Sequence, residues 1–386
     1  EFVEFHRRYY HPSNARIVLY GNIPTEEYLA FLNDNFLSRF EAGPSVPTIP
    51  EQPRWNEPRE VETTYPLDES SETHRRSSVT VNWLLFPVTE TRRLLSVAVL
   101  AEILLGHSGS PLTKALIDSG LGNDLSPLVG LETDVHEAVF SAGLRGTDPE
   151  RKAEIEDVIF TTLSHLADGG IPAEVVESAL RRVEFRNREI KGGPNGMRAL
   201  RRILRTWMYG AGPAAALRFS EDIADLRRRV DSTPRFFESL IGEHLLDNRH
   251  RSTVVVRPDA ERTTRDREEE RQALRAIGDR LTGEARERIE SESVALQTLQ
   301  ETPDDPEEVA KIPFLRLTDI PREVRTIPFE RSDGPAGIPV YKHDEFTNGI
   351  VYVDLAFDFG ELTERQEALL NVLGAAFGEI GLPDVP

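Results

Sequence analysis

The sequence predicts an α+β fold in which helices cover one face of an antiparallel sheet. Strand-like and helix-like stretches occur in separate runs rather than in strict alternation, as in α+β proteins. Val79, Val81, Trp83 and Leu85 alternate with other residues, as in a strand with one buried face. Residues 259–301, with twelve acids and eight arginines, divide the chain into two globular parts. At 386 residues, the chain has room for two or three domains.

The N-terminal part contains elements that cannot form a core by themselves. Residues 1–11 have the pattern of a helix end, residues 15–20 that of a short strand, and residues 24–40 that of a helix. One strand between two helices cannot bury its own apolar surface, so we expect another part of a domain to cover it. Residues 42–76 are rich in Pro, Glu, Arg and Thr, which predicts an extended connector.

Residues 77–257 have the pattern of a complete α+β domain. Glycines and prolines at the ends of the apolar stretches mark where elements start and stop. The predicted strands are 79–87, 135–144 and 251–257. The predicted helices are 92–105, 111–119, 149–167, 172–190, 197–209, 214–229 and 234–247.

The charged stretch predicts a helical hairpin linker, which we place at 258–311. Gly283 lies between two helical stripes of apolar residues, where one helix can stop and another begin. The stripes are Leu274, Ile277 and Leu281, then Ile289, Leu296 and Leu299. A solvated linker with partial helix is the alternative. Beyond it, strands at 324–329, 338–342 and 349–358 and a helix at 363–378 indicate only part of a third domain, 312–386.

Composition excludes several classes of protein. The formal net charge of −20 argues against binding to nucleic acid or to anionic membrane surfaces. The absence of cysteine excludes disulfides and thiolate metal sites. No apolar run approaches a transmembrane span, and no signal-peptide pattern is present. Residues 181–205 carry nine basic residues and two acids, which indicates either a wall that faces an acidic peptide or partner, or solvated and packed helix faces.

Five stretches resemble a known family, in the same order from one end of the chain to the other. They are similar to the presequence protease subfamily of the pitrilysin/insulinase zinc metallopeptidases. The stretches are FHRRYYHPSNARIVLYGNI (5–23), GSPLTKALIDSGLGNDLSP (109–127), HLLDNRHRSTVVVRPD (244–259), PDDPEEVAKIPFLRLTDIP (303–321) and EFTNGIVYVDLAFD (345–358).

The resemblance implies pitrilysin-like α+β domains joined by the charged helical hairpin. Enzymes of this family have four homologous domains in two halves that close around an unfolded peptide. By that template, 1–41 is the C-terminal tail of the first, catalytic domain, 77–257 is the second domain, and 312–386 is the N-terminal part of the third. The implied parent is a monomeric zinc endopeptidase that degrades short presequence-like peptides. We expect it in the bacterial cytoplasm, or in the mitochondrial matrix or plastid of a eukaryote.

The catalytic motif of the family is absent from this sequence. Its zinc site is an inverted His-x-x-Glu-His motif on a first-domain helix, whereas none of the nine histidines here has that spacing. His6 and His11 are five residues apart with no Glu between them, and His136–Glu137 has no second His nearby. We therefore expect no catalytic or metal-binding residue in this chain, no activity of the chain alone, and first and fourth domains outside it. Self-association of the isolated chain through uncovered surfaces is a further expectation.

A loop and helix at 109–122 form the remaining candidate contact with substrate or with a neighbouring domain. Glycine permits close approach of another backbone, and two glycines follow the helix in close succession. The candidate residues are Ser110, Leu112, Gly120, Gly122 and Asn123. The alternative is a helix C-cap and turn. A different class of function, a non-catalytic scaffold or binding subunit related to processing peptidases, also stays open.

Overall fold

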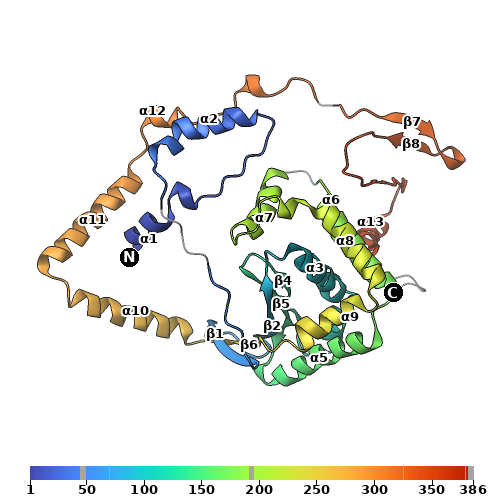
Figure 1. The fold of residues 1–386 in the computed structure, drawn as a ribbon, viewed down its shortest axis with the longest axis horizontal. Coiled ribbons are helices and arrows are strands. Elements are labelled where there is room, and N and C mark those ends of the chain that lie inside the picture. Colours follow the sequence, from blue (N-terminus) through green and yellow to red (C-terminus); the bar gives the residue numbers. More distant parts are fainter. Residues whose placement is uncertain (44–48, 69, 191–194, 325, 379, 381–386) are drawn as a thin grey trace. The chain divides into compact units, whose positions relative to one another are not determined.

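The computed structural model describes residues 1–386 except 44–48, 69, 191–194, 325, 379 and 381–386. The chain divides into two compact units. The first contains residues 1–65, 70–259 and 347–386, and the second contains residues 66–69 and 260–346. The α+β fold is confirmed, because the first unit combines one six-stranded sheet with a set of helices (Figure 1).

The sheet is centred on two long strands, β2 and β5, which pair antiparallel with each other. Its order is β1–β6–β2–β5–β3, and β4 also pairs with β5. The strand bounds are β1 Arg59–Pro66, β2 Ser77–Pro87, β3 Asp124–Leu125, β4 Gly130–Glu132, β5 Glu137–Thr147 and β6 Arg251–Asp259.

The helices of the first unit follow the sequence pattern closely. A π-helical turn at Gly242–Leu246 follows α9 directly. The helix bounds are α1 Phe2–Tyr9, α2 Thr25–Asn35, α3 Thr91–Leu105, α4 Pro111–Asp118, α5 Lys152–Gly169, α6 Ala173–Arg188, α7 Asn195–Trp207, α8 Phe219–Ser232, α9 Phe236–Ile241 and α13 Glu364–Ala376.

The two faces of the sheet differ in chemistry, as the alternation in β2 predicts. Val79, Val81 and Trp83 are completely buried on the helical face, where Trp83 lies 5.8 Å from the ring of Phe140. The Trp83 Nε1 group donates a hydrogen bond of 2.8 Å to the Leu245 carbonyl, so the indole also satisfies its polar atom. This face holds the hydrophobic core of the unit.

The opposite face of the sheet is polar. The Ser141 hydroxyl donates to Asn82 Oδ1 at 2.8 Å, and Asn82 Nδ2 donates to Thr80 Oγ1 at 3.1 Å. At one end of this face, Glu137 accepts from the backbone NH of Gln52 at 2.6 Å. Residues 50–55 are thereby fixed to the sheet, although the sequence predicted only an extended connector there.

The second unit begins with the charged linker. The two predicted helices are confirmed as α10 Arg262–Gly278 and α11 Gly283–Glu301. Gly283 is the first residue of α11 rather than the stop between the helices, because the Thr282 hydroxyl caps α11 by accepting from the NH of Ala285. The apolar stripes of residues 260–301 stay exposed, with Leu274 60% and Leu299 73% accessible. The unit also contains α12 Pro306–Val309 and a hairpin of β7 Glu330–Asp333 and β8 Pro339–Lys342.

Several predicted strands are wrong. Residues 15–20 and 349–358 have strand composition but no hydrogen-bonded neighbour among the residues described, and a strand requires one. The strand expected at 324–329 begins instead at Glu330, and residue 325 lies outside the described part. Conversely, β1 lies inside the stretch predicted as a connector, and the two- and three-residue strands β3 and β4 were not predicted.

Candidate functional site

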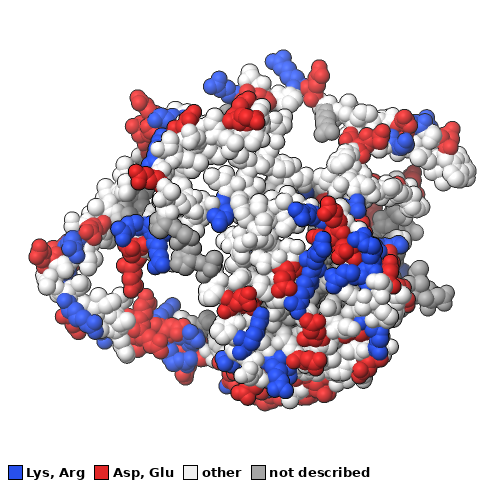
Figure 2. Space-filling view, in the orientation of Figure 1, with Lys and Arg blue, Asp and Glu red and all other residues white. Residues whose placement is uncertain are grey.

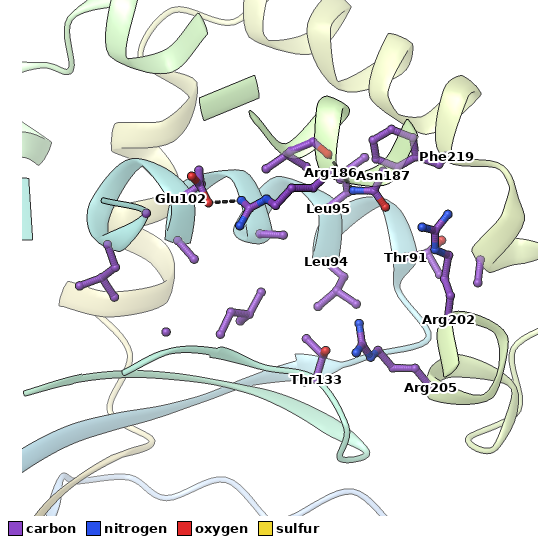
Figure 3. Close-up of a pocket in the computed structure, with 18 of the residues that line it drawn as sticks. Thr91, Leu94, Leu95, Glu102, Thr133, Arg186, Asn187, Arg202, Arg205 and Phe219 are labelled. Carbon is purple, nitrogen blue, oxygen red and sulfur yellow. Dashed lines mark hydrogen bonds and ion pairs between the residues drawn. The ribbon is translucent and has the colours of Figure 1, made fainter. Parts of the chain in front are cut away.

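The largest candidate for a ligand site is a cavity of about 610 Å³ in the first unit. Helices α3, α6 and α7 and the segment around β3 and β4 line it (Figure 3). This volume is within the range of pockets that bind small ligands, roughly 300–1,000 Å³. Its walls come from parts of the sequence that are more than 100 residues apart, so only the folded domain assembles it.

The apolar floor of the cavity is the second face of α3. This helix is apolar on two sides: Val97, Leu100 and Leu104 point into the core and are buried. Leu94 and Leu95 recur on the other side and line the cavity, together with further apolar residues of the same helix. A helix that is apolar nearly all round needs cover on both sides, and on this side the cover is incomplete.

One end of the cavity is closed by an ion-pair cluster. Glu102 of α3 is only 6% exposed, and its carboxylate lies between two arginines of α6. Arg182 Nε lies 3.1 Å from Glu102 Oε1, and Arg186 donates to Oε2. Two cations share one buried carboxylate, so the cluster as a whole is positive.

The other end of the cavity carries Arg202 and Arg205 (Figure 3). Ile203 and Thr206 of α7 are buried and fix the rotation of this helix, which brings the two arginines to the cavity three residues apart. Arg205 Nε lies 2.8 Å from Asp134 Oδ1. Half-buried Arg202 forms no hydrogen bond or ion pair with any residue that the structure describes.

The surroundings of Arg202 disfavour its charge. Burial lowers the pKa of the Arg202 guanidinium below its usual value, and the nearby Arg205 and Arg198 lower it further. Arginine nevertheless stays protonated in proteins. The cavity therefore contains a half-buried positive charge that is not compensated within the described part of the chain, beside an apolar surface.

The sequence-predicted contact residues lie elsewhere, around α4 and the turn that follows it. The side chains of Ser110 and Leu112 are completely buried, and Ser110 Oγ accepts from the NH of His107 at 3.2 Å. Gly120 has a φ of +65°, which favours glycine, and its carbonyl accepts from Arg75 at 3.4 Å. A Cβ on Gly122 would lie 2.8 Å from the Arg145 carbonyl, and the NH of Asn123 donates to the same carbonyl.

The turn at 120–123 therefore packs against β5, and its contact with substrate or a neighbouring domain stays a prediction. None of these five residues lines the cavity. The basic stretch 181–205 gave a partial signal for the cavity, because it contains all three arginines that line it. The apolar row of α3 was read only as core, although its two-sided pattern could have indicated a second surface.

The described residues do not form a metal site. No group of three His, Asp or Glu side chains in the described ranges is placed to hold a metal ion. The buried histidines are occupied by packing: His244 lies 5.4 Å from the Phe86 ring, and His250 stacks on Trp55 at 4.2 Å. Among the described helices, none has the length and apolar character that crossing a bilayer requires.

Comparison with known proteins identifies the family. Residues 1–183 match the family model described as "Peptidase M16 inactive domain", and residues 256–385 match the model of a region associated with subfamily C of the same peptidases. Presequence protease 1, chloroplastic/mitochondrial, of Arabidopsis thaliana is 34% identical over all of this chain and 36% of its own length. Protein HypA of Clostridium perfringens is 31% identical over 99% of this chain and 39% of its own length. The mitochondrial presequence protease of Mus musculus is 27% identical over 98% and 36%.

Solved structures give weaker likeness over the whole chain. A protease from Helicobacter pylori has a TM-score of 0.48 at 15% identity and covers 66% of this chain and 58% of its own. The first half of the periplasmic protease PqqL of Escherichia coli has a TM-score of 0.46 at 14% identity, with coverage of 66% and 53%.

The sequence relatives and the two family models agree on the family that the five stretches predicted. The chain spans somewhat more than a third of the length of its curated relatives, 36% to 39%. The chain belongs to the M16 peptidase family, in which it is similar to the middle portion of presequence proteases and matches the inactive domain.

Proposed function

We propose that this chain is the non-catalytic middle part of a zinc metalloendopeptidase that degrades short unfolded peptides. The observation that carries the proposal is the similarity to presequence proteases over 98% to 100% of the chain. The match of residues 1–183 to an inactive domain fits the same role. The described histidines and carboxylates do not assemble a zinc site, so no chemical step is assigned to a residue of this chain.

On this proposal, the chain contributes walls and a connection rather than catalysis. Residues 77–257 are the second domain of the peptidase, 258–311 join the two halves of a closing chamber, and 312–386 begin the third domain. The turn at Gly120–Asn123 is a contact with substrate or with a neighbouring domain. The unpacked apolar side chains of α1, α2 and residues 312–377 are surfaces for the first, third and fourth domains to cover.

The charge of the chain suits cationic peptides. The net charge of −20 creates a negative field that raises the local concentration of a cationic, amphipathic presequence. Figure 2 shows the acidic and basic side chains intermingled over the visible face, so the attraction is general rather than confined to one acidic field. Such attraction weakens as salt is added, because the Debye length shrinks from about 30 Å at 0.01 M to about 10 Å at 0.1 M.

The test is the intact mass and the zinc content of the native gene product. An antibody raised against residues 77–257 captures the protein from its source cells for mass spectrometry and elemental analysis. We expect a mass well above 43.5 kDa, about one zinc per chain, and peptide hydrolysis that a chelator abolishes. A native mass equal to this chain, without zinc or hydrolysis, would instead favour the scaffold or binding subunit.

A further inference from the structure

We propose that the cavity between α3, α6 and α7 binds the C-terminal carboxylate of a peptide that ends in a large aliphatic residue. The aliphatic side chain would rest on the α3 floor, and the carboxylate would pair with Arg202 and Arg205. That the ligand is a peptide rests on the proposed function, whereas the affinity for a carboxylate beside an apolar group rests on the cavity alone.

The unpaired guanidinium of Arg202 carries the argument for an anion. A charge taken out of water is costly unless a partner compensates it, and all but one of the arginines around this cavity have a partner. Arg202 is the exception within the described residues. A planar guanidinium matches a carboxylate with two parallel hydrogen bonds, so a carboxylate ligand would supply the missing compensation.

The floor carries the argument for an adjacent aliphatic group. Figure 3 shows Leu94 and Leu95 between the Glu102–Arg186 pair at one end and the two arginines of α7 at the other. A C-terminal leucine places a carboxylate and an isobutyl group on a single Cα atom, which matches cation and apolar surface side by side. A side-chain carboxylate in mid-peptide would have to bring two further backbone segments into the same space.

The ionic cluster at the far end sets the polarity of the site. Glu102 is neutralised by Arg182 and Arg186, and Asp222, the other acid of the lining, pairs with Arg92 at 3.2 Å. The acids that face the cavity are thus already paired. The net local charge is positive, although the chain as a whole carries −20.

The experiment measures fluorescence anisotropy with a fluorescein-labelled pentapeptide of four alanines and a C-terminal leucine. The same peptide as C-terminal amide removes only the charge, and an amidated peptide ending in glutamate moves the carboxylate to a side chain. We expect the free acid to bind at least ten-fold more tightly than either amide. Arg202→Gln should reduce the preference for acid over amide by roughly ten-fold or more, as expected for a charge-assisted pair.

Arg201→Gln is the matched control, since Arg201 is the exposed neighbour on the same helix and does not line the cavity. It should leave the acid-to-amide ratio within two-fold of the parent. The affinity of the amide probe and the far-UV circular dichroism of Arg202→Gln should match the parent, which separates loss of the ligand pair from loss of the fold. Arg205→Gln provides a second variant with the same expected direction.

Equal binding of acid and amide, or equal effects of Arg201→Gln and Arg202→Gln, would overturn the proposal. Tight binding of the glutamate amide would overturn the assignment to the peptide terminus. Decanoate that competes where the leucine peptide does not bind would show that the occupant is not a peptide. Each of these outcomes leaves the mass and zinc test of the peptidase role unaffected, because binding to this chain requires no catalysis.

Discussion

The ion-pair cluster at the end of the cavity makes an asymmetric prediction about stability. Glu102 is 6% exposed, whereas its partners Arg182 and Arg186 are 37% and 58% exposed. Two variants separate the partners: Glu102→Gln removes the buried acid, and the double variant Arg182→Gln/Arg186→Gln removes both cations. The buried member of the pair should decide which change is worse.

The magnitudes follow from what each variant leaves behind. The double variant leaves a buried carboxylate with no cation beside it, which typically costs about 3–5 kcal/mol. Glu102→Gln leaves two arginines that water can reach, so the loss should be only about 1–3 kcal/mol, the range for a hydrogen bond to a charged group. The double arginine variant should therefore be less stable than Glu102→Gln by on the order of 2 kcal/mol.

Urea unfolding followed by circular dichroism measures both free energies. Arg181→Gln serves as the control, because Arg181 is 76% exposed and pairs with a half-exposed Glu177 on the same helix. Its loss should cost less than about 1 kcal/mol, as is usual for surface pairs. If Glu102→Gln proved as damaging as the double arginine variant, the reasoning that burial of the carboxylate dominates the cluster would be refuted.

Two further predictions concern pH and close packing. Burial lowers the pKa of His244 below its ordinary 6.5, so the unfolded chain binds a proton that the folded chain does not, and the free energy of unfolding falls as pH drops below about 6.5, by at most about 1.4 kcal/mol per pH unit. Urea midpoints from pH 7.5 to 5 should show a smaller loss in His244→Leu and an unchanged loss in His165→Gln, the exposed control; equal slopes in all three proteins would contradict the assignment. Gly143→Ala should destabilise by more than about 1–3 kcal/mol, since its Cβ would lie 2.1 Å from the Val79 carbonyl of the neighbouring strand. Gly242→Ala, which meets nothing within 4 Å in a helical turn, should stabilise by about 0.4–1 kcal/mol, and thermal melts that ranked the two alike would show that the β2–β5 contact is looser than described.

The central domain could be predicted from sequence because its signals are local. Alternation in β2, the glycine that ends α3 and the proline that begins α4 are all set within a few residues, and these elements occur where expected. Strands that depend on distant partners were less accessible. Residues 349–358 have ideal strand composition and still form no strand, whereas β1 forms from a charged stretch because β6 offers it a free edge.

The cavity could be predicted even less, because it is a property of three helices packed together. The basic stretch marked α6 and α7, but sequence does not show which arginines have partners. Arg188 pairs with Glu184 four residues before it, a contact that spacing suggests. Arg186 instead pairs with Glu102, 84 residues away, and its neighbours on α7 depend on the rotation that Ile203 and Thr206 impose.

Local and global charge have opposite signs in this molecule, and that contrast lets one titration separate the two proposals. A cationic peptide is drawn to the chain by the net charge of −20, an attraction between exposed charges that salt screens. A carboxylate against half-buried Arg202 is screened much less, because partly buried pairs lie outside the reach of bulk ions. With a cationic peptide in acid and amide forms, added salt should therefore weaken both forms together while the ratio of their affinities changes little. A ratio that collapsed in parallel with the overall affinity would mean that the carboxylate is read at the surface, and that the cavity is not where the peptide ends.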